Sequence, residues 1–169
     1  MGFINAAHQW KLGLALVAAL GMAGCSTKPV DDGAGGLGGV GAGVAAPGSS
    51  QDFVVNVGDK VFFETDSTEL TANAQATLDK QARWLTQYSR YNFTIEGHAD
   101  ERGTREYNFA LGARRSEVTK EYLAARGVAA ARIKTISYGK ERPVAVCNDI
   151  SCWSQNRRAV TVLNGGTNS

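Results

Sequence analysis

The residues most capable of chemistry lie close together in one stretch of the sequence, Gly97–Gly103 (GHADERG). Its two carboxylates accept hydrogen bonds, and its arginine donates them. The segment that follows carries Asn108, Leu111 and Arg115, whose spacing of three and four positions puts them on one face of a helix. A second polar group, Asn156–Arg158, lies near the C-terminus. Side chains of these types bind charged ligands through ion pairs and charge-assisted hydrogen bonds.

Catalysis would require a different set of residues. A hydrolase needs a metal site, a nucleophile with its base, or two carboxylates on opposite sides of a cleft. The sequence holds only 2 histidines, and Asp100 and Glu101 are neighbours with no second carboxylate placed opposite them. We therefore expect a binding protein with no catalytic residue, no metal and no cofactor. A periplasmic cell-wall hydrolase is one alternative, and a module that binds only other proteins is a second.

The polar stretch lies between a predicted strand and a predicted helix. Residues 91–96 alternate as a half-buried strand, and Thr104 can cap a helix that Gly127 ends. Ligands of open α/β sheets bind at the carboxyl ends of strands, where GHADERG lies. The apolar stripe of this helix is predicted to be Tyr107, Leu111, Val118 and Tyr122.

The remaining pattern completes the fold prediction. Thr71 is expected to cap a helix that runs to about Tyr88, and further strands are expected at residues 60–63, 134–138 and 159–163. The order β-α-β-α-β-β predicts an α/β (α+β) sandwich, in which two main helices cover one face of a mixed sheet.

The N-terminal third of the chain differs in composition from the rest. Residues 1–24 read as an export signal, because the apolar run LGLALVAAL follows Lys11 and is too short to span a bilayer. Residues 25–51 contain eight glycines within Gly33–Gly48 and no aromatic side chain, which predicts a flexible tether. The folded domain is expected to be residues 52–169.

The charge balance excludes one class of partner. The 169 residues include 18 Lys and Arg against 16 Asp and Glu, a net charge of +2. Nucleic-acid binding needs a concentrated basic surface, so we expect no such partner. The apolar content of 43% is sufficient for one hydrophobic core.

The three cysteines are expected to have two different roles. Met22-Ala23-Gly24-Cys25 resembles the lipobox of bacterial lipoproteins, in which the cysteine is lipidated. An ordinary signal peptide with an incidental cysteine is the alternative. Cys147 and Cys152 remain as a pair, and export would place them where a disulfide forms. Two unpaired thiols are the other possibility for that pair.

Several motifs in one order support a family resemblance. The run GHADERGTREYNFALGARRSEVTKEYL, followed by SYGKERP and NRRAV, resembles the peptidoglycan-associated lipoproteins of the OmpA-like domain family, and the ending CWSQNRRAVTVLNG resembles their alphaproteobacterial branch. The resemblance implies non-covalent binding of peptidoglycan through the diaminopimelate of its stem peptide. It also implies attachment to the outer membrane through Cys25, a periplasmic domain, and partnership with TolB and other Tol proteins in the Tol-Pal system.

The resemblance also implies roles for individual residues. Diaminopimelate ends in an ammonium and a carboxylate, which Asp100 and Arg115 are expected to bind respectively. Asp66, Asn108 and Arg157 match further motif positions, and backbone groups near Thr65 and Leu111 are expected to line the same pocket.

Each of these roles has a structural alternative. Asp100 is also suited to cap the turn into the helix, and Arg115 to be a solvated residue or the internal partner of Asp100. Asp66 fits ordinary turn chemistry, and Asn108 and Arg157 fit structural hydrogen bonding. His98 is expected to satisfy a backbone carbonyl, and contact with the ligand is the alternative. Thr65 departs from the aromatic residue of many relatives, which leaves the shape of the pocket open at that point.

Overall fold

The computed structural model describes residues 45–165. The predicted export signal (1–24), the predicted lipidation site Cys25 and most of the predicted tether (25–51) lie outside the described residues.

The described residues form a mixed sheet of four strands, namely β1 (Lys60–Phe62), β2 (Asn92–His98), β3 (Ile133–Gly139) and β4 (Arg158–Asn164). The spatial order is β1-β4-β2-β3. Both β1 and β2 run antiparallel to β4, whereas β2 and β3 run parallel to each other. The last strand in sequence is thus inserted between the first and the second.

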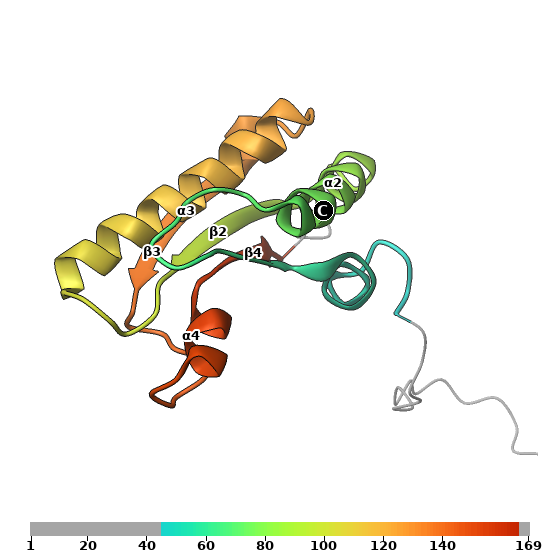
Figure 1. The fold of residues 1–169 in the computed structure, drawn as a ribbon. Coiled ribbons are helices and arrows are strands. Elements are labelled where there is room, and N and C mark those ends of the chain that lie inside the picture. The colour runs from blue at the N-terminus through green and yellow to red at the C-terminus, as the bar shows by residue number, and fades with distance from the viewer. Residues whose placement is uncertain (1–44, 166–169) are drawn as a thin grey trace, which may run out of the picture. The chain divides into compact units, whose positions relative to one another are not determined.

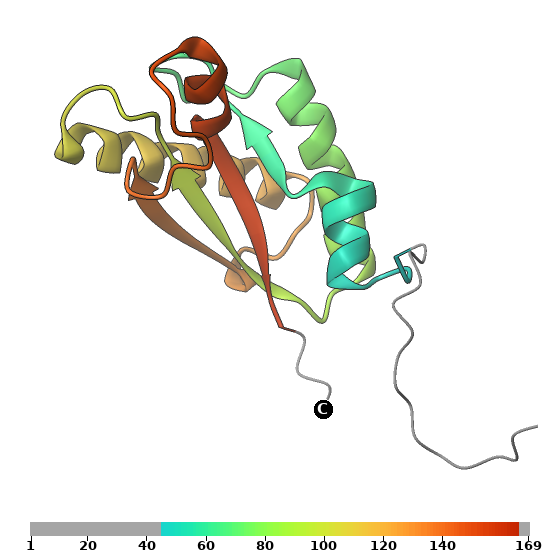
Figure 2. The ribbon, with the colours of Figure 1, turned by 90° about the horizontal axis from the view of Figure 1, so that it is seen from below.

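Two long helices, α2 (Ala72–Gln87) and α3 (Arg105–Ala125), cover one face of this sheet (Figures 1 and 2). The predicted α/β sandwich is therefore confirmed. Both predicted caps are also present, because the side chains of Thr71 and Thr104 accept hydrogen bonds from the backbone N–H groups three residues on. Gly127, which adopts a φ of +93°, follows the end of α3, as expected for a helix-terminating glycine.

The hydrophobic core lies between the sheet and the two helices. Phe93 and Ile95 of β2 are fully buried, as their alternation predicts, and Leu78 and Leu85 of α2 pack in the same cluster. Burial of each such side chain contributes about 1.5–3 kcal/mol to folding.

The predicted apolar stripe of α3 is wrong in part. Tyr107 is 45% exposed, while the buried face of the helix includes Asn108, Arg115, Ser116 and Thr119. These polar side chains are buried with hydrogen-bond partners, since Asn108 donates to the Arg102 carbonyl and Thr119 to the Arg115 carbonyl. α3 also lies very close to β2, because a Cβ on Gly97 would lie only 1.8 Å from the carbonyl oxygen of Gly112.

The structure contains short helical elements that the hydrophobic pattern does not reveal. They are α1 (Ser50–Asp52), the π-helical turn η1 (Phe53–Gly58), the 3₁₀ turn η2 (Ala130–Arg132) and α4 (Ile150–Asn156). Of these, only a turn near residues 128–132 is expected from the sequence. α4 lies on the side of the sheet away from α2 and α3 (Figure 1).

The folded part also begins earlier than residue 52. The carbonyl of Gly48 accepts hydrogen bonds from Arg90 Nη2 at 2.7 Å and from the Tyr91 hydroxyl at 2.9 Å. The carboxylate of Asp52 accepts a hydrogen bond from Trp84 Nε1 at 2.8 Å. The end of the predicted tether is thus fixed to the domain. None of the described helices is long and apolar enough to cross a membrane.

Candidate ligand-binding site

A cavity of about 190 Å³ lies beside the carboxyl end of β2 and the first turns of α3. It brings together six of the seven residues predicted for the ligand site and adds three that the sequence analysis does not assign. The predicted lining residues are Thr65, Asp66, Asp100, Asn108, Leu111 and Arg115, and the additional ones are Arg102, Gly103 and Tyr107.

Asp100 provides the acidic side of the cavity. Its carboxylate accepts hydrogen bonds from Arg102 Nη2 at 2.7 Å and Arg102 Nε at 3.1 Å, and from the Arg102 backbone N–H at 3.2 Å. Burial raises the pKa of Asp100, but the hydrogen bonds and charge of Arg102, together with Arg157, outweigh burial and hold the pKa below its ordinary 3.8. Asp100 is therefore ionised at neutral pH.

Arg115 provides the basic side, and it is fully buried. Its guanidinium donates to the backbone carbonyls of His98 at 2.8 Å, Ser67 at 2.9 Å and Glu64 at 3.1 Å. These bonds connect the loop after β1 to the end of β2. Burial, and then the charge of Arg157, lower the pKa of Arg115 to about 10, so the group still carries its charge at neutral pH.

The guanidinium of Arg115 has no carboxylate within salt-bridge distance among residues 45–165. The alternative that Arg115 pairs directly with Asp100 is therefore wrong. Three of its five N–H groups donate to carbonyls, and two remain. A buried cation is normally paired, so this position is suited to an anionic ligand group.

Asp66 and Tyr107 form the outer edge of the cavity. The Tyr107 hydroxyl donates a hydrogen bond to the Asp66 carboxylate, which raises the pKa of Tyr107. Asp66 has a φ of +54°, an uncommon conformation for a residue other than glycine. Tyr107 contributes an aromatic side chain to the cavity from α3, and Thr65 lines the same cavity.

Asn108 and Arg157 hold the site in shape. Asn108 donates from its amide to the Arg102 carbonyl at 2.7 Å, which fixes the loop before α3. Arg157 lies outside the cavity lining. It donates to the Phe63 carbonyl at 3.0 Å and reaches the Asp100 carboxylate at 3.5 Å.

His98, buried at the end of β2, has neither ring nitrogen hydrogen-bonded within the described part of the chain. The expectation that it satisfies a backbone carbonyl is wrong. Burial, with the charges of Arg158 and Arg142, lowers its pKa to about 4. The carboxylate of Glu96 lies 3.6 Å from Nε2.

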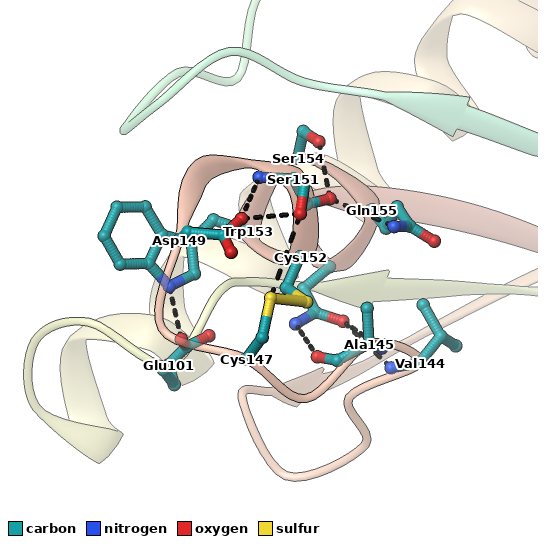
Figure 3. The surroundings of a disulfide bond; sticks show 11 residues. Glu101, Val144, Ala145, Cys147, Asp149, Ser151, Cys152, Trp153, Ser154 and Gln155 are labelled. Carbon is teal, nitrogen blue, oxygen red and sulfur yellow. Dashed lines mark hydrogen bonds between the residues drawn. A yellow bond between two sulfur atoms is a disulfide. The ribbon is translucent and has the colours of Figure 1, made fainter.

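A disulfide joins Cys147 to Cys152, as the cysteine pattern predicts (Figure 3). The bond ties the loop before α4 to the helix, and the Asn156 side chain holds the same loop through the backbone of Val144 and Ala145. The next residue after Cys152, Trp153, donates its indole N–H to the carboxylate of Glu101 (Figure 3). The disulfide-linked segment is thereby connected to the loop that carries Asp100.

Other features of the described residues offer less chemistry. No group of three His, Cys, Asp or Glu side chains in residues 45–165 is arranged to hold a metal ion. A larger groove of about 620 Å³ lies between α3 and β3. Of its four charged residues, Arg105 and Glu141 pair with each other at 3.1 Å, and Lys140 donates to the backbone carbonyls of Glu101 and Gly103. The small cavity at Asp100 and Arg115 is therefore the candidate site.

Comparison with known proteins gives one consistent result. Residues 62–158 match the OmpA family. The chain is 67% identical to the peptidoglycan-associated lipoprotein of Rhizobium meliloti over 153 residues, covering 90% of this chain and 86% of that protein. It is 61% identical to the peptidoglycan-associated lipoprotein of Mesorhizobium japonicum over 165 residues, covering 98% of each.

Solved structures support the same fold. The crystal structure of the peptidoglycan-associated lipoprotein from Burkholderia pseudomallei superposes with a TM-score of 0.61 at 40% identity, covering 63% of this chain and 90% of that chain. The C-terminal domain of Helicobacter pylori MotB has a TM-score of 0.61 at 20% identity, covering 65% and 87% respectively, which is a likeness of fold alone.

Proposed function

The chain belongs to the OmpA family, and from this membership and the geometry of the cavity we propose that it binds peptidoglycan non-covalently through the diaminopimelate of the stem peptide. The observation that carries the proposal is the pair of opposite charges on one small cavity. Asp100 is an ionised carboxylate, and Arg115 is a buried guanidinium with no carboxylate partner in the described residues.

The chemistry of diaminopimelate matches this pair. Its free end carries an ammonium and a carboxylate on one carbon, so a receptor needs an acceptor and a donor a short distance apart. The two unallocated N–H groups of Arg115 are suited to the ligand carboxylate, because a guanidinium binds a carboxylate through parallel hydrogen bonds. Asp100 is suited to the ammonium, and the cavity of about 190 Å³ is sized for the end of a side chain rather than a whole stem peptide.

The cellular role that we propose follows from the N-terminal segment and the relatives. Lipidation of Cys25 would attach the chain to the outer membrane, and residues 26–47 would allow the periplasmic domain to reach the cell wall. The relatives named above are peptidoglycan-associated lipoproteins. On this basis we propose that the chain tethers the outer membrane to peptidoglycan, acts with TolB and other Tol proteins, and is not an enzyme.

Cosedimentation with purified peptidoglycan tests the binding proposal. Asp100→Asn keeps the shape of the side chain and removes its charge, and Arg115→Lys keeps the charge and removes the planar donor pair. Each variant is expected to bind at least about tenfold more weakly, because a charge-assisted interaction in a buried site is lost. Asp79→Asn is the matched control, since Asp79 pairs with Arg126 outside the cavity, and it should bind as the wild type does.

The same assay separates the alternatives. Circular dichroism of each variant establishes that the fold is intact. Undiminished binding by folded Asp100→Asn and Arg115→Lys would remove the proposed site. Release of soluble peptidoglycan fragments during incubation would favour a hydrolase, and binding to TolB without binding to peptidoglycan would favour a pure protein-interaction module.

A further inference from the structure

Resting on the proposed function, we infer that Arg102 is an internal competitor of the ligand: its guanidinium occupies the Asp100 carboxylate that the ligand ammonium must reach, and binding requires Arg102 to leave. Two parallel hydrogen bonds join these side chains, Nη2 to Oδ2 at 2.7 Å and Nε to Oδ1 at 3.1 Å. Arg102 also lines the cavity. It therefore fills space beside the Asp100 carboxylate and also uses the acceptor sites of that carboxylate.

All the hydrogen-bond acceptor sites of the Asp100 carboxylate are in use. A carboxylate offers about four acceptor sites. Oδ1 accepts from the backbone N–H and Nε of Arg102, and Oδ2 accepts from Arg102 Nη2 and from Arg157 Nη1 at 3.5 Å. An ammonium that arrives at this carboxylate must therefore replace at least one existing donor.

Arg102 is the donor that is able to move. The backbone N–H is fixed in the turn by the bond from Asn108 to the Arg102 carbonyl. The side chain of Arg157 is only 6% exposed and is also bonded to the Phe63 carbonyl. The side chain of Arg102, by contrast, is 41% exposed and bonds to no other carboxylate in residues 45–165.

Trp153 gives the displaced guanidinium a second partner. The guanidinium carbon of Arg102 lies 4.2 Å from the centre of the Trp153 ring, within range of a cation–π interaction. The ring is held by its bond to Glu101 and by its place next to Cys152 of the disulfide (Figure 3). Arg102 is thus placed between an anion and an aromatic face, and it keeps the aromatic contact when it releases the anion.

The test is isothermal titration of the purified protein with a soluble stem peptide that ends in diaminopimelate. Arg102→Gln removes the competing cation and is expected to bind the peptide about fivefold more tightly, the size expected for a partly exposed ion pair. Arg105→Gln is the matched control. It removes the same charge three residues away, from a side chain that pairs with Glu141, and should leave the affinity unchanged.

A second ligand distinguishes competition from a structural effect. When the distal amine of the peptide is acetylated, no ammonium competes with Arg102, so Arg102→Gln should give no gain. An equal gain with both peptides, or unchanged or weaker binding of the parent peptide to Arg102→Gln, overturns the inference while leaving the proposed function in place. If the wild type fails to bind the parent peptide and Asp100→Asn makes no difference, the proposed function and the inference both fall.

Discussion

Replacing His98 by phenylalanine should remove a specific part of the acid sensitivity of this fold. Neither ring nitrogen is hydrogen-bonded in the described residues, so the substitution loses no hydrogen bond. The ring also lies 5.6 Å from that of Tyr138, in a setting suited to a second aromatic group. Phenylalanine therefore keeps much of the packing while removing the titratable group.

The size of the effect follows from the pKa of His98. Burial and the charges of Arg158 and Arg142 lower this pKa from 6.5 to about 4 in the folded state. Below about pH 6.5 the unfolded chain takes up a proton that the folded chain does not, so stability falls as the pH falls from 6.5 to 4. The lost stability is about 3 kcal/mol, at about 1.4 kcal/mol for each pH unit. Well above pH 6.5 the histidine is neutral in both states and contributes no pH dependence.

Urea unfolding of both proteins at pH 7 and at pH 4.5 measures this contribution. Between pH 7 and pH 4.5 the free energy of unfolding of the wild type should fall by about 2–3 kcal/mol more than that of His98→Phe. The imidazole proton resonance of His98 gives the pKa directly and should show no titration between pH 5 and 8. Parallel stability curves for the two proteins, or a His98 pKa at or above 6.5, would refute the reasoning.

Three further predictions concern stability. Replacing both Cys147 and Cys152 by serine should lower the free energy of unfolding, measured with urea, by about 2 kcal/mol, because the bond closes a short loop. A reductant should lower the free energy of unfolding of the wild type by the same amount. Gly97→Ala should lower stability by more than about 3 kcal/mol or prevent folding, since its Cβ would meet the Gly112 carbonyl, whereas Gly165→Ala, with open space around it, should leave the melting temperature unchanged. Thr71→Ala should cost about 1 kcal/mol through loss of the α2 cap, and an unchanged melting temperature would contradict the assigned cap.

Much of the fold is recorded locally in the sequence. The cap residue Thr104 and the terminating glycine Gly127 define α3 because capping involves atoms within a few residues of each other. The alternation of Phe93 and Ile95 predicts the buried face of β2 for the same reason. The short helix α4 is different, since its first residue Ile150 is 60% exposed and the disulfide through Cys152 holds the segment in place.

The sequence identifies the residues of the site, whereas the tertiary structure determines which groups they contact. The order of motifs in the sequence was sufficient to name Asp100 and Arg115 and to expect them at one pocket. Only the tertiary structure decided that Arg115 donates to three carbonyls, that Arg102 occupies Asp100, and that Trp153 lies over Arg102. The reason is physical. Periodicity and capping depend on neighbours along the chain, whereas a guanidinium has several acceptors of similar strength, and the packing of distant segments selects among them.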